Sequence, residues 1–396
     1  MGLMQKLSNS IVSLSKYVQH KNTDILVKQV LDIANFDPII QSAPIELKKV
    51  IFVTPYMNKH SGGLTSVLRI AMRLSKNNID VYFTCPTNDN ISEMKINAHD
   101  NLSCYQANYI TWEEAKESVY DFIIAVQDTY VYYARKLKGY LIYFVQDYEP
   151  YFNPVGDRYF LSKKSLELGE DIISLGKWNL QEINRNISNS KLGNLYSIEF
   201  PFEISEYPLS KKNFRSLRRK KEINIAVYVK REPKRLPGIV MNLLNQLHDE
   251  YSKEGINLNV FYFGLHSIEK VKYGVNLGRI SKAEIKKLYD KCDFGMVASM
   301  TNISLVPYEM IASGLPVIEF ADGSYEAFLG KDTAILLESF SYKELKRKMD
   351  IYINDISQLN CLCEKAQNKI EKLSWNRSAE QFENILKSII TKTNKN

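Results

Sequence analysis

The sequence has 396 residues, more than one ordinary hydrophobic core accommodates and a length typical of two domains. Its 45% apolar and 24% charged residues exclude a disordered chain, and no apolar run reaches the roughly 18 residues of a membrane-spanning helix. No signal peptide is recognisable and the five cysteines are scattered, so we expect reduced thiols, no metal site and a cytoplasmic location. The formal charge of +7 favours an anionic partner without identifying it.

Residues 1–48 predict a helical extension. Apolar residues recur on one helical face at Ile11, Leu14 and Val18, and a second amphipathic pattern runs from Ile25 to Ala34. We expect this segment to pack onto the body of the protein. Weak contact with a membrane surface is the open alternative.

From residue 49 short apolar runs alternate with helical patterns. Thr111 and Glu114 form a capping box at the start of one of the helices. The alternation predicts a first Rossmann-like domain over 49–205, in which a parallel sheet has helices on both faces. The predicted strands are 50–54, 80–84, 122–126, 141–145 and 172–175.

A basic segment at 206–222 interrupts the alternation. Pro208 breaks regular structure, and residues 211–221 contain seven positive charges. We predict an interdomain linker. Contact with an anionic lipid or a phosphorylated acceptor is the alternative interpretation.

The alternation then restarts and predicts a second Rossmann-like domain over 223–375. Capping-box patterns occur at Ser281 with Glu284 and at Ser341 with Glu344. The fold class is therefore α/β, with two doubly wound parallel sheets. We expect the C-terminal segment, 376–396, to pack back on the first domain. The predicted strands are 223–229, 258–263, 275–278, 294–297 and 315–319, and the final helices are 358–372 and 378–390.

Two segments of the first domain follow predicted strands, at the edge where open parallel sheets bind ligands. The loop with His60, Gly62 and Gly63 precedes a helix, and paired glycines there let backbone amides approach an anion. Asp147 and Glu149 leave a buried strand and are candidates for orienting sugar hydroxyls or handling a proton. Ordinary turns are the alternative in both places.

In the second domain, four cations follow the strand that ends near Tyr228. They are Lys230, Arg231, Lys234 and Arg235. Guanidinium groups fit a diphosphate and neutralise charge on a leaving group. A solvated charge run is the alternative, but this run lies at the predicted mouth of the sheet.

The segment 299–318 carries the strongest signal. Ser304 is a suitable N-cap for a helix over 305–312, whose first amides can bind a phosphate. Glu309 lies one turn further on, where it can accept both hydroxyls of a ribose. An ordinary strand–helix–strand unit explains the apolar residues but not this acid. Upstream, Gly278 and Arg279 form a turn that can frame a base and reach a phosphate, unless Arg279 is only a surface residue.

These segments resemble, in the same order, the nucleotide-binding half of retaining GT-B glycosyltransferases of family four. The Gly62-Gly63 loop resembles the acceptor side of that family. A narrower resemblance is to WsaF-type bacterial rhamnosyltransferases that use dTDP-rhamnose. The matching residues are Gln146-Asp147-Tyr148-Glu149-Pro150, Phe152, Pro154 and Gly156, Tyr228 with Arg231 and Lys234 or Arg235, Gly278-Arg279-Ile280-Ser281, Leu288-Tyr289, Cys292-Asp293, and the block 309–318.

The resemblance implies a GT-B fold and a metal-independent, retaining transfer of a sugar from a nucleotide-sugar donor, without a further cofactor. Our donor prediction is L-rhamnose from dTDP-rhamnose, and the acceptor is a bacterial surface glycan or lipid-linked glycan. Closure of the two domains is expected to align the reactants. The implied donor site is Tyr228, Arg231, Lys234, Arg235, Gly278, Arg279, Ser304, Leu305, Tyr308 and Glu309; the catalytic candidates are Asp147, Glu149 and Arg231; and the acceptor or phosphate loop is His60, Gly62 and Gly63.

One departure from the family pattern bears on the donor sugar. The family has two glutamates eight positions apart, and Thr301 replaces the first of them. The alternatives to a transferase are a sugar-nucleotide epimerase of GT-B fold and a non-catalytic nucleotide- or lipid-binding protein. Peripheral contact with an anionic inner membrane face stays open, whereas nucleic acid is not expected because the cations do not form an aromatic-lined groove.

Overall fold

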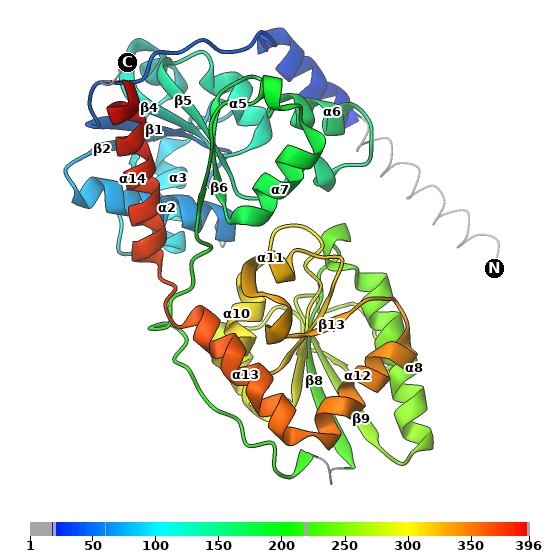
Figure 1. The fold of residues 1–396 in the computed structure, drawn as a ribbon. Helices are drawn as coiled ribbons and strands as arrows, with labels where there is room; N and C mark the ends of the chain where they lie inside the picture. The colour runs from blue at the N-terminus through cyan, green and yellow to red at the C-terminus, as the bar shows by residue number, and fades with distance from the viewer. Residues whose placement is uncertain (1–17, 19–20, 60, 218–220, 394–396) are drawn as a thin grey trace, which may run out of the picture. The chain divides into compact units, whose positions relative to one another are not determined.

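The computed structural model describes residues 18, 21–59, 61–217 and 221–393 (Figure 1). The chain divides into two compact units. Unit 1 contains the chain up to Leu175, Asn179–Ile198 and the residues from Ala379 onward, and unit 2 contains Gly176–Trp178 and Glu199–Ser378. The predicted helix around residues 11–18 lies outside the described residues except for Val18, whereas the second predicted helix is present over 21–33. None of the described helices is long and apolar enough to cross a membrane.

Unit 1 is built on seven parallel strands in the order β3-β2-β1-β4-β5-β6-β7. Chain order reverses direction between β1 and β4, and such switch points are where doubly wound sheets bind ligands. The strands are β1 (Lys49–Val53), β2 (Asp80–Thr84), β3 (Asn108–Tyr109), β4 (Val119–Ala125), β5 (Lys138–Val145), β6 (Asp171–Leu175) and β7 (Leu195–Ile198). The helices between them are α2 (Gly62–Lys76), α3 (Ile91–Asn101), α4 (Trp112–Glu117), α5 (Asp128–Ala134), α6 (Asp157–Lys164) and α7 (Lys177–Asn186), with a 3-10 turn η1 (Glu149–Phe152).

Unit 2 repeats this order with six parallel strands, β10-β9-β8-β11-β12-β13, so its switch point lies between β8 and β11. The strands are β8 (Glu222–Tyr228), β9 (Asn257–Phe263), β10 (Val275–Asn276), β11 (Phe294–Met296), β12 (Val317–Phe320) and β13 (Ile335–Leu337). The helices are α8 (Pro237–Lys253), α9 (Lys282–Lys291), α10 (Leu305–Ala312), α11 (Tyr325–Leu329), α12 (Tyr342–Asn354) and α13 (Ile356–Ile370), with a 3-10 turn η4 (Pro233–Arg235) after β8.

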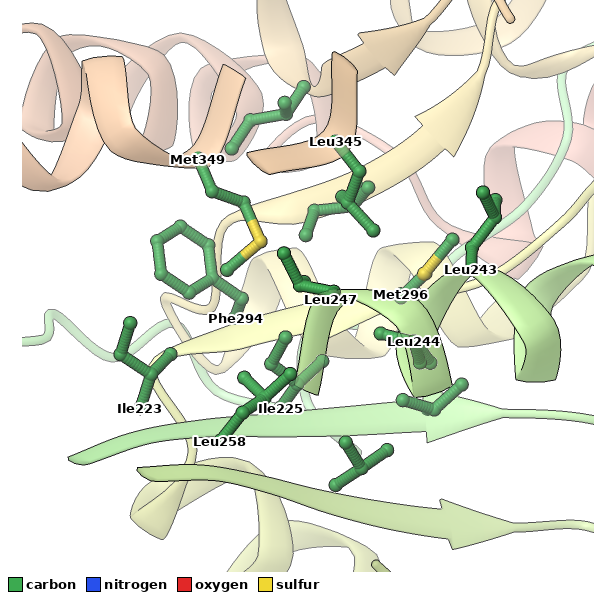
Figure 2. Packing of buried hydrophobic residues seen from close by; sticks show 14 of the residues in the cluster. Ile223, Ile225, Leu243, Leu244, Leu247, Leu258, Phe294, Met296, Leu345 and Met349 are labelled. Atoms are coloured by element: carbon green, nitrogen blue, oxygen red, sulfur yellow. The ribbon is translucent and has the colours of Figure 1, made fainter. Parts of the chain in front are cut away.

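Helices cover both faces of the unit 2 sheet because its strands are apolar on both sides. On β8, Ile223 and Ile225 belong to one buried cluster and Ala226 belongs to the other. Figure 2 shows the first cluster, in which Leu244 of α8 and Met349 of α12 pack against the strands. This packing fixes the carboxyl ends of β8 and β11 beside each other, in register at Met296 and Val227.

The C-terminal helix α14 (Trp375–Thr393) packs on unit 1. Phe382 is fully buried there, with its ring centroid 5.4 Å from that of Phe144 on β5. Glu383 is 2% exposed and accepts hydrogen bonds from Arg73 at 3.2 Å and from Asn77 at 2.6 Å. Burial alone would raise the pKa of Glu383, but Lys387, Arg73 and Asn77 reverse this and lower it.

The segment that follows β7 is packed into unit 2 and is not an exposed linker. Tyr207 and Phe214 are buried, and the Lys212 ammonium donates to the carbonyls of Asp290 and Cys292 at 2.8 and 2.7 Å. These hydrogen bonds show that part of the basic segment 206–222 attaches the chain to the end of α9. Its residues 218–220 lie outside the described part of the chain.

The predicted element types are largely confirmed, and their ends shift by a few residues. Both capping boxes at Thr111 and Ser281 form. At Ser341 the prediction was wrong, because Ser341 makes no side-chain cap and Glu344 instead accepts from Ser339 and from the Glu338 amide. The short strands β3, β7 and β13 carry too few residues to show a period, and were not predicted.

Candidate functional site

The cations predicted to hold a diphosphate lie at the carboxyl end of β8, next to the switch point of unit 2. Arg231 keeps 55% of its side chain exposed and donates to Glu269 at 2.6 Å. The hydrogen bond from Arg231 is the main reason that the pKa of Glu269 is lowered. An exposed ion pair of this kind contributes little stability because solvent screens it. Arg231 can therefore exchange Glu269 for an anionic ligand at small cost.

Arg235 differs from Arg231 because it is buried, with 5% of its surface exposed. It ends the 3-10 turn η4, and the next residue, Leu236, adopts a left-handed φ of 45° that turns the chain into α8. Its Nη1 donates to the Ala298 carbonyl at 2.9 Å and to Ser299 Oγ at 3.3 Å. Arg235 thus joins the segment after β8 to the segment after β11.

The loop 298–304 between β11 and α10 is held from several sides. The Met300 amide donates to the carbonyl of Lys234 at 3.2 Å, and the Ser299 carbonyl accepts from the Ser324 amide at 2.7 Å. Gly323 is required beside it, because a Cβ there would lie 2.4 Å from the Ser299 oxygen. The start of α10 is therefore fixed against the cationic segment.

Ser304 occupies the N-cap position of α10 as predicted, but it makes no capping hydrogen bond. Its Oγ is buried and has no hydrogen-bond partner among the residues that the structure describes. The first residue of the helix, Leu305, is 36% exposed. The first amides of α10 thus have no side-chain cap, which leaves them available to a ligand oxygen.

Glu309 lies one turn into α10 and is partly buried. Burial raises its pKa, and the neighbouring Tyr207 hydroxyl and Lys282 ammonium oppose that rise. The Tyr207 hydroxyl is itself buried and lies against the Glu309 carboxylate, so that burial and then this acid raise the pKa of Tyr207. A carboxylate has about four acceptor positions, so Glu309 can accept from a pair of sugar hydroxyls as well as from Tyr207.

Tyr308 lies in the core instead of the site. It is 1% exposed, and its ring stacks on Phe200 at 5.2 Å and on Phe202 at 5.7 Å. The prediction placed Tyr308 among the nucleotide-binding residues, but a ring enclosed in this way offers no surface to a ligand. Tyr308 therefore has a packing role, since it lies with Pro307 on the buried face of α10.

The remaining predicted donor residues lie on the two turns after β8 and β10. Tyr228 packs against Phe263 at 5.3 Å and receives the Arg235 guanidinium over its ring at 5.8 Å. Gly278 has a left-handed φ of 69°, and its carbonyl oxygen accepts a hydrogen bond from the Gly264 amide at 2.8 Å, whereas Arg279 is exposed. Glycine at 278 thus serves the turn itself.

In unit 1 the structure brings the glycine loop to the polar segment after β5. Gly62 and Gly63 begin α2 and are exposed, and Ser61 caps the helix by accepting from the Leu64 amide at 3.5 Å. A Cβ on Gly63 would lie 3.4 Å from the side-chain oxygen of Gln146. His60, the third predicted residue of this loop, lies outside the described residues.

Glu149 and Asp147 have structural bonds in this segment. The Glu149 carboxylate accepts from the Asp128 amide at 2.5 Å and from the Tyr143 hydroxyl at 2.6 Å. It thereby caps α5, whose own N-cap, Gln127, makes no side-chain bond. Burial, followed by the charge of Asp128, raises the pKa of Glu149 well above its usual value. Asp147 is 8% exposed and accepts from the Tyr148 amide at 2.8 Å.

Several residues at these edges were not predicted. In unit 2, Tyr207 lies beside Glu309, and the buried Ser299 and Glu319 follow β11 and lie on β12; in unit 1, Gln146 lies beside Gly63. Glu319 had a readable signal, since it is an acid within an otherwise apolar strand. The others had none, because their importance depends on neighbours far away in the sequence.

Comparisons with known proteins identify the fold to which the two sheets belong. No family model and no curated protein matches the chain. Among solved structures, sucrose-phosphate synthase from Thermosynechococcus elongatus is 13% identical with a TM-score of 0.63, covering 87% of this chain and 99% of that one. TarM is 10% identical with a TM-score of 0.64, covering 87% and 100% of the two chains.

A third solved structure, Anabaena HepE in complex with UDP and glucose, is 14% identical with a TM-score of 0.63, and the match covers 86% of this chain and 100% of that one. These structural neighbours are GT-B glycosyltransferases. The chain therefore has the GT-B fold, as predicted. At such low identities the likeness concerns the fold alone.

Proposed function

We propose that this protein is a glycosyltransferase that binds a nucleotide sugar in unit 2. The observation that carries the proposal is the meeting of two segments at the switch point of the second sheet, where Arg235 bonds to Ala298 and Ser299. Two buried polar atoms of these segments, Arg235 Nε and Ser304 Oγ, have no hydrogen-bond partner among the described residues. Buried polar groups normally have partners, so a set of unpartnered ones indicates a place for a polar ligand.

In the proposed complex, Arg231 and Arg235 bind the diphosphate together with the amides that begin α10. Glu309 accepts the ribose hydroxyls. An acceptor hydroxyl forms a bond to C1 of the donor sugar while the bond from C1 to the diphosphate oxygen breaks. The leaving diphosphate takes the acceptor proton, and the cations stabilise its charge. This reaction, which retains configuration, needs neither a protein nucleophile nor a metal ion.

On the acceptor side we assign the exposed start of α2, with Gly62 and Gly63, to binding, and Asp147 to orienting the acceptor hydroxyl. Glu149 is reassigned from proton handling to positioning, because its carboxylate is buried and holds α5. Within this function dTDP-rhamnose is the proposed donor and a bacterial surface or lipid-linked glycan the proposed acceptor, reached from the cytoplasmic membrane face. The support for these finer choices is the sequence resemblance around residues 146–156 and 228–235.

A thermal-shift panel of dTDP, UDP, GDP and their sugars tests the donor. We expect one nucleoside diphosphate and its sugar to raise the melting temperature, with the dTDP series giving the largest rise. A panel without any response contradicts the proposed function. A response confined to UDP or GDP keeps the transferase and rejects dTDP-rhamnose.

Incubation with the preferred donor alone separates transfer from its rivals. A transferase releases nucleoside diphosphate only with an acceptor or slowly to water. A new sugar nucleotide formed without acceptor identifies an epimerase. Tight binding with no turnover on any glycan acceptor identifies a non-catalytic binding protein.

Replacing Glu309 with alanine should weaken donor binding by about 10- to 100-fold. The reason is the loss of charge-assisted hydrogen bonds to the ribose, on the order of 1.5–3 kcal/mol. Calorimetry with the donor measures the effect, and Glu326→Ala is the matched control because Glu326 is an exposed glutamate on α11. Equal affinities of the two variants would remove Glu309 from the site.

A further inference from the structure

A second acid lies directly behind the proposed diphosphate site. Glu319 is on β12 and is fully buried. Its Oε2 accepts from the Ser299 amide at 3.1 Å and from the Phe320 amide at 3.2 Å, whereas its Oε1 has no hydrogen-bond partner within the described part of the chain. Few acids are buried so completely without a direct ion pair. An apolar side chain would pack equally well at this position of the strand, so packing does not explain the acid.

Ser299 connects this acid to the proposed diphosphate site. Its amide donates to Glu319, and its Oγ accepts from Arg235 Nη1 at 3.3 Å. The Ala298 carbonyl, one residue earlier, accepts from the same guanidinium nitrogen at 2.9 Å. The acid and the arginine are therefore both hydrogen-bonded to Ser299, in buried surroundings where charges interact strongly.

We propose that Glu319 is a positioning residue of the donor site, a buried counter-charge that orients Arg235 through Ser299 and sets how strongly Arg235 attracts a diphosphate. This inference rests on the proposed function, since it concerns the same site. When Glu319 is ionised it offsets part of the positive charge of Arg235. When Glu319 is protonated, the full positive charge of Arg235 acts on the ligand.

The charged and titratable groups around Glu319 define the pH range of the effect. Burial raises the pKa of Glu319 to about 7, against the lowering effect of Ser299, Phe320 and Arg235. The other facing groups are Arg235 of η4, which stays charged, and Tyr325 of α11, whose pKa burial raises beyond the working range. Of these groups, Glu319 alone changes its charge around neutral pH.

The sign of the effect follows from linkage. A bound diphosphate brings negative charge near Glu319, which favours the protonated acid and raises its pKa further. Donor affinity is then highest below the pKa of the free protein and falls as the pH rises through about 7. If binding raises the pKa by about one unit, the whole fall is about tenfold.

The test is calorimetry with the preferred nucleotide sugar between about pH 6 and 8.5, over which Glu319 changes its charge. A nucleotide sugar is used because its diphosphate is a diester whose charge does not change in this range. We expect the dissociation constant of the wild type to rise by about tenfold across the range. The variant Glu319→Gln should show a flat profile, with tighter binding than the wild type at the alkaline end.

Glu170→Gln is the matched control. Glu170 is also a buried carboxylate, 1% exposed, and burial raises its pKa to about 8, but it precedes β6 in unit 1. We expect this variant to keep the wild-type pH profile. A Glu319→Gln profile that follows the wild type overturns the role of Glu319 alone, whereas a wild type that binds no nucleotide sugar overturns the proposed function as well.

A measurement on the wild type keeps the inference testable if Glu319→Gln does not fold. Donor binding at about pH 7 should take up protons, which appears as a dependence of the binding enthalpy on the ionisation enthalpy of the buffer. Uptake of a fraction of a proton supports the inference. Binding without proton uptake overturns it.

Discussion

Replacing Arg231 with alanine should weaken binding of the nucleoside diphosphate by at least about a hundredfold, because two charge-assisted hydrogen bonds of roughly 1.5–3 kcal/mol each are lost. The fold should be unaffected, since Arg231 is largely exposed and its one ion pair, to Glu269, is at the surface. Calorimetry with the nucleotide that responds in the thermal-shift panel measures the loss.

Two variants control this experiment. Arg347→Ala removes an exposed arginine from α12 of the same unit and should leave affinity unchanged. Glu269→Gln removes the carboxylate that competes for Arg231, so affinity should stay equal or improve by a few fold at most. If nucleotide affinity does not change in Arg231→Ala, the assignment of this cation to the diphosphate is wrong.

Replacing Phe382 with alanine should destabilise unit 1 by about 3–5 kcal/mol, the usual cost of deleting a buried aromatic ring. Phe382 is fully buried against Phe144, and neighbouring Glu383 fixes the helix through Arg73 and Asn77. Denaturant unfolding, followed by hydrogen exchange of the α14 amides, measures the loss and locates it.

Asn384→Ala on the same helix is the control, because Asn384 is exposed and alanine favours a helix. We expect its stability to lie within about 0.5 kcal/mol of the wild type. If Phe382→Ala unfolds like this control, α14 does not contribute to unit 1 in solution, and the division of the chain into its two units is incorrect.

Local chemistry was enough to propose some candidate site residues. The cations after β8, the helix at 305–312 and the glycines that begin α2 are each marked by residue types whose properties need no neighbours to be recognised. The roles of single side chains were harder to predict. Glu149 and Glu309 both lie near the carboxyl ends of parallel strands, where ligands bind. The Glu149 carboxylate, however, already accepts hydrogen bonds from the Asp128 amide and the Tyr143 hydroxyl.

Short apolar runs alternating with helical stripes were enough to predict the class of fold, because a parallel sheet covered on both faces is the way to bury them. The strand orders, the burial of Tyr308 and the link from Glu319 through Ser299 to Arg235 became apparent only in three dimensions. The physical reason is that a strand period or a helix cap is local, whereas burial and hydrogen-bond partners depend on residues brought together from distant parts of the chain.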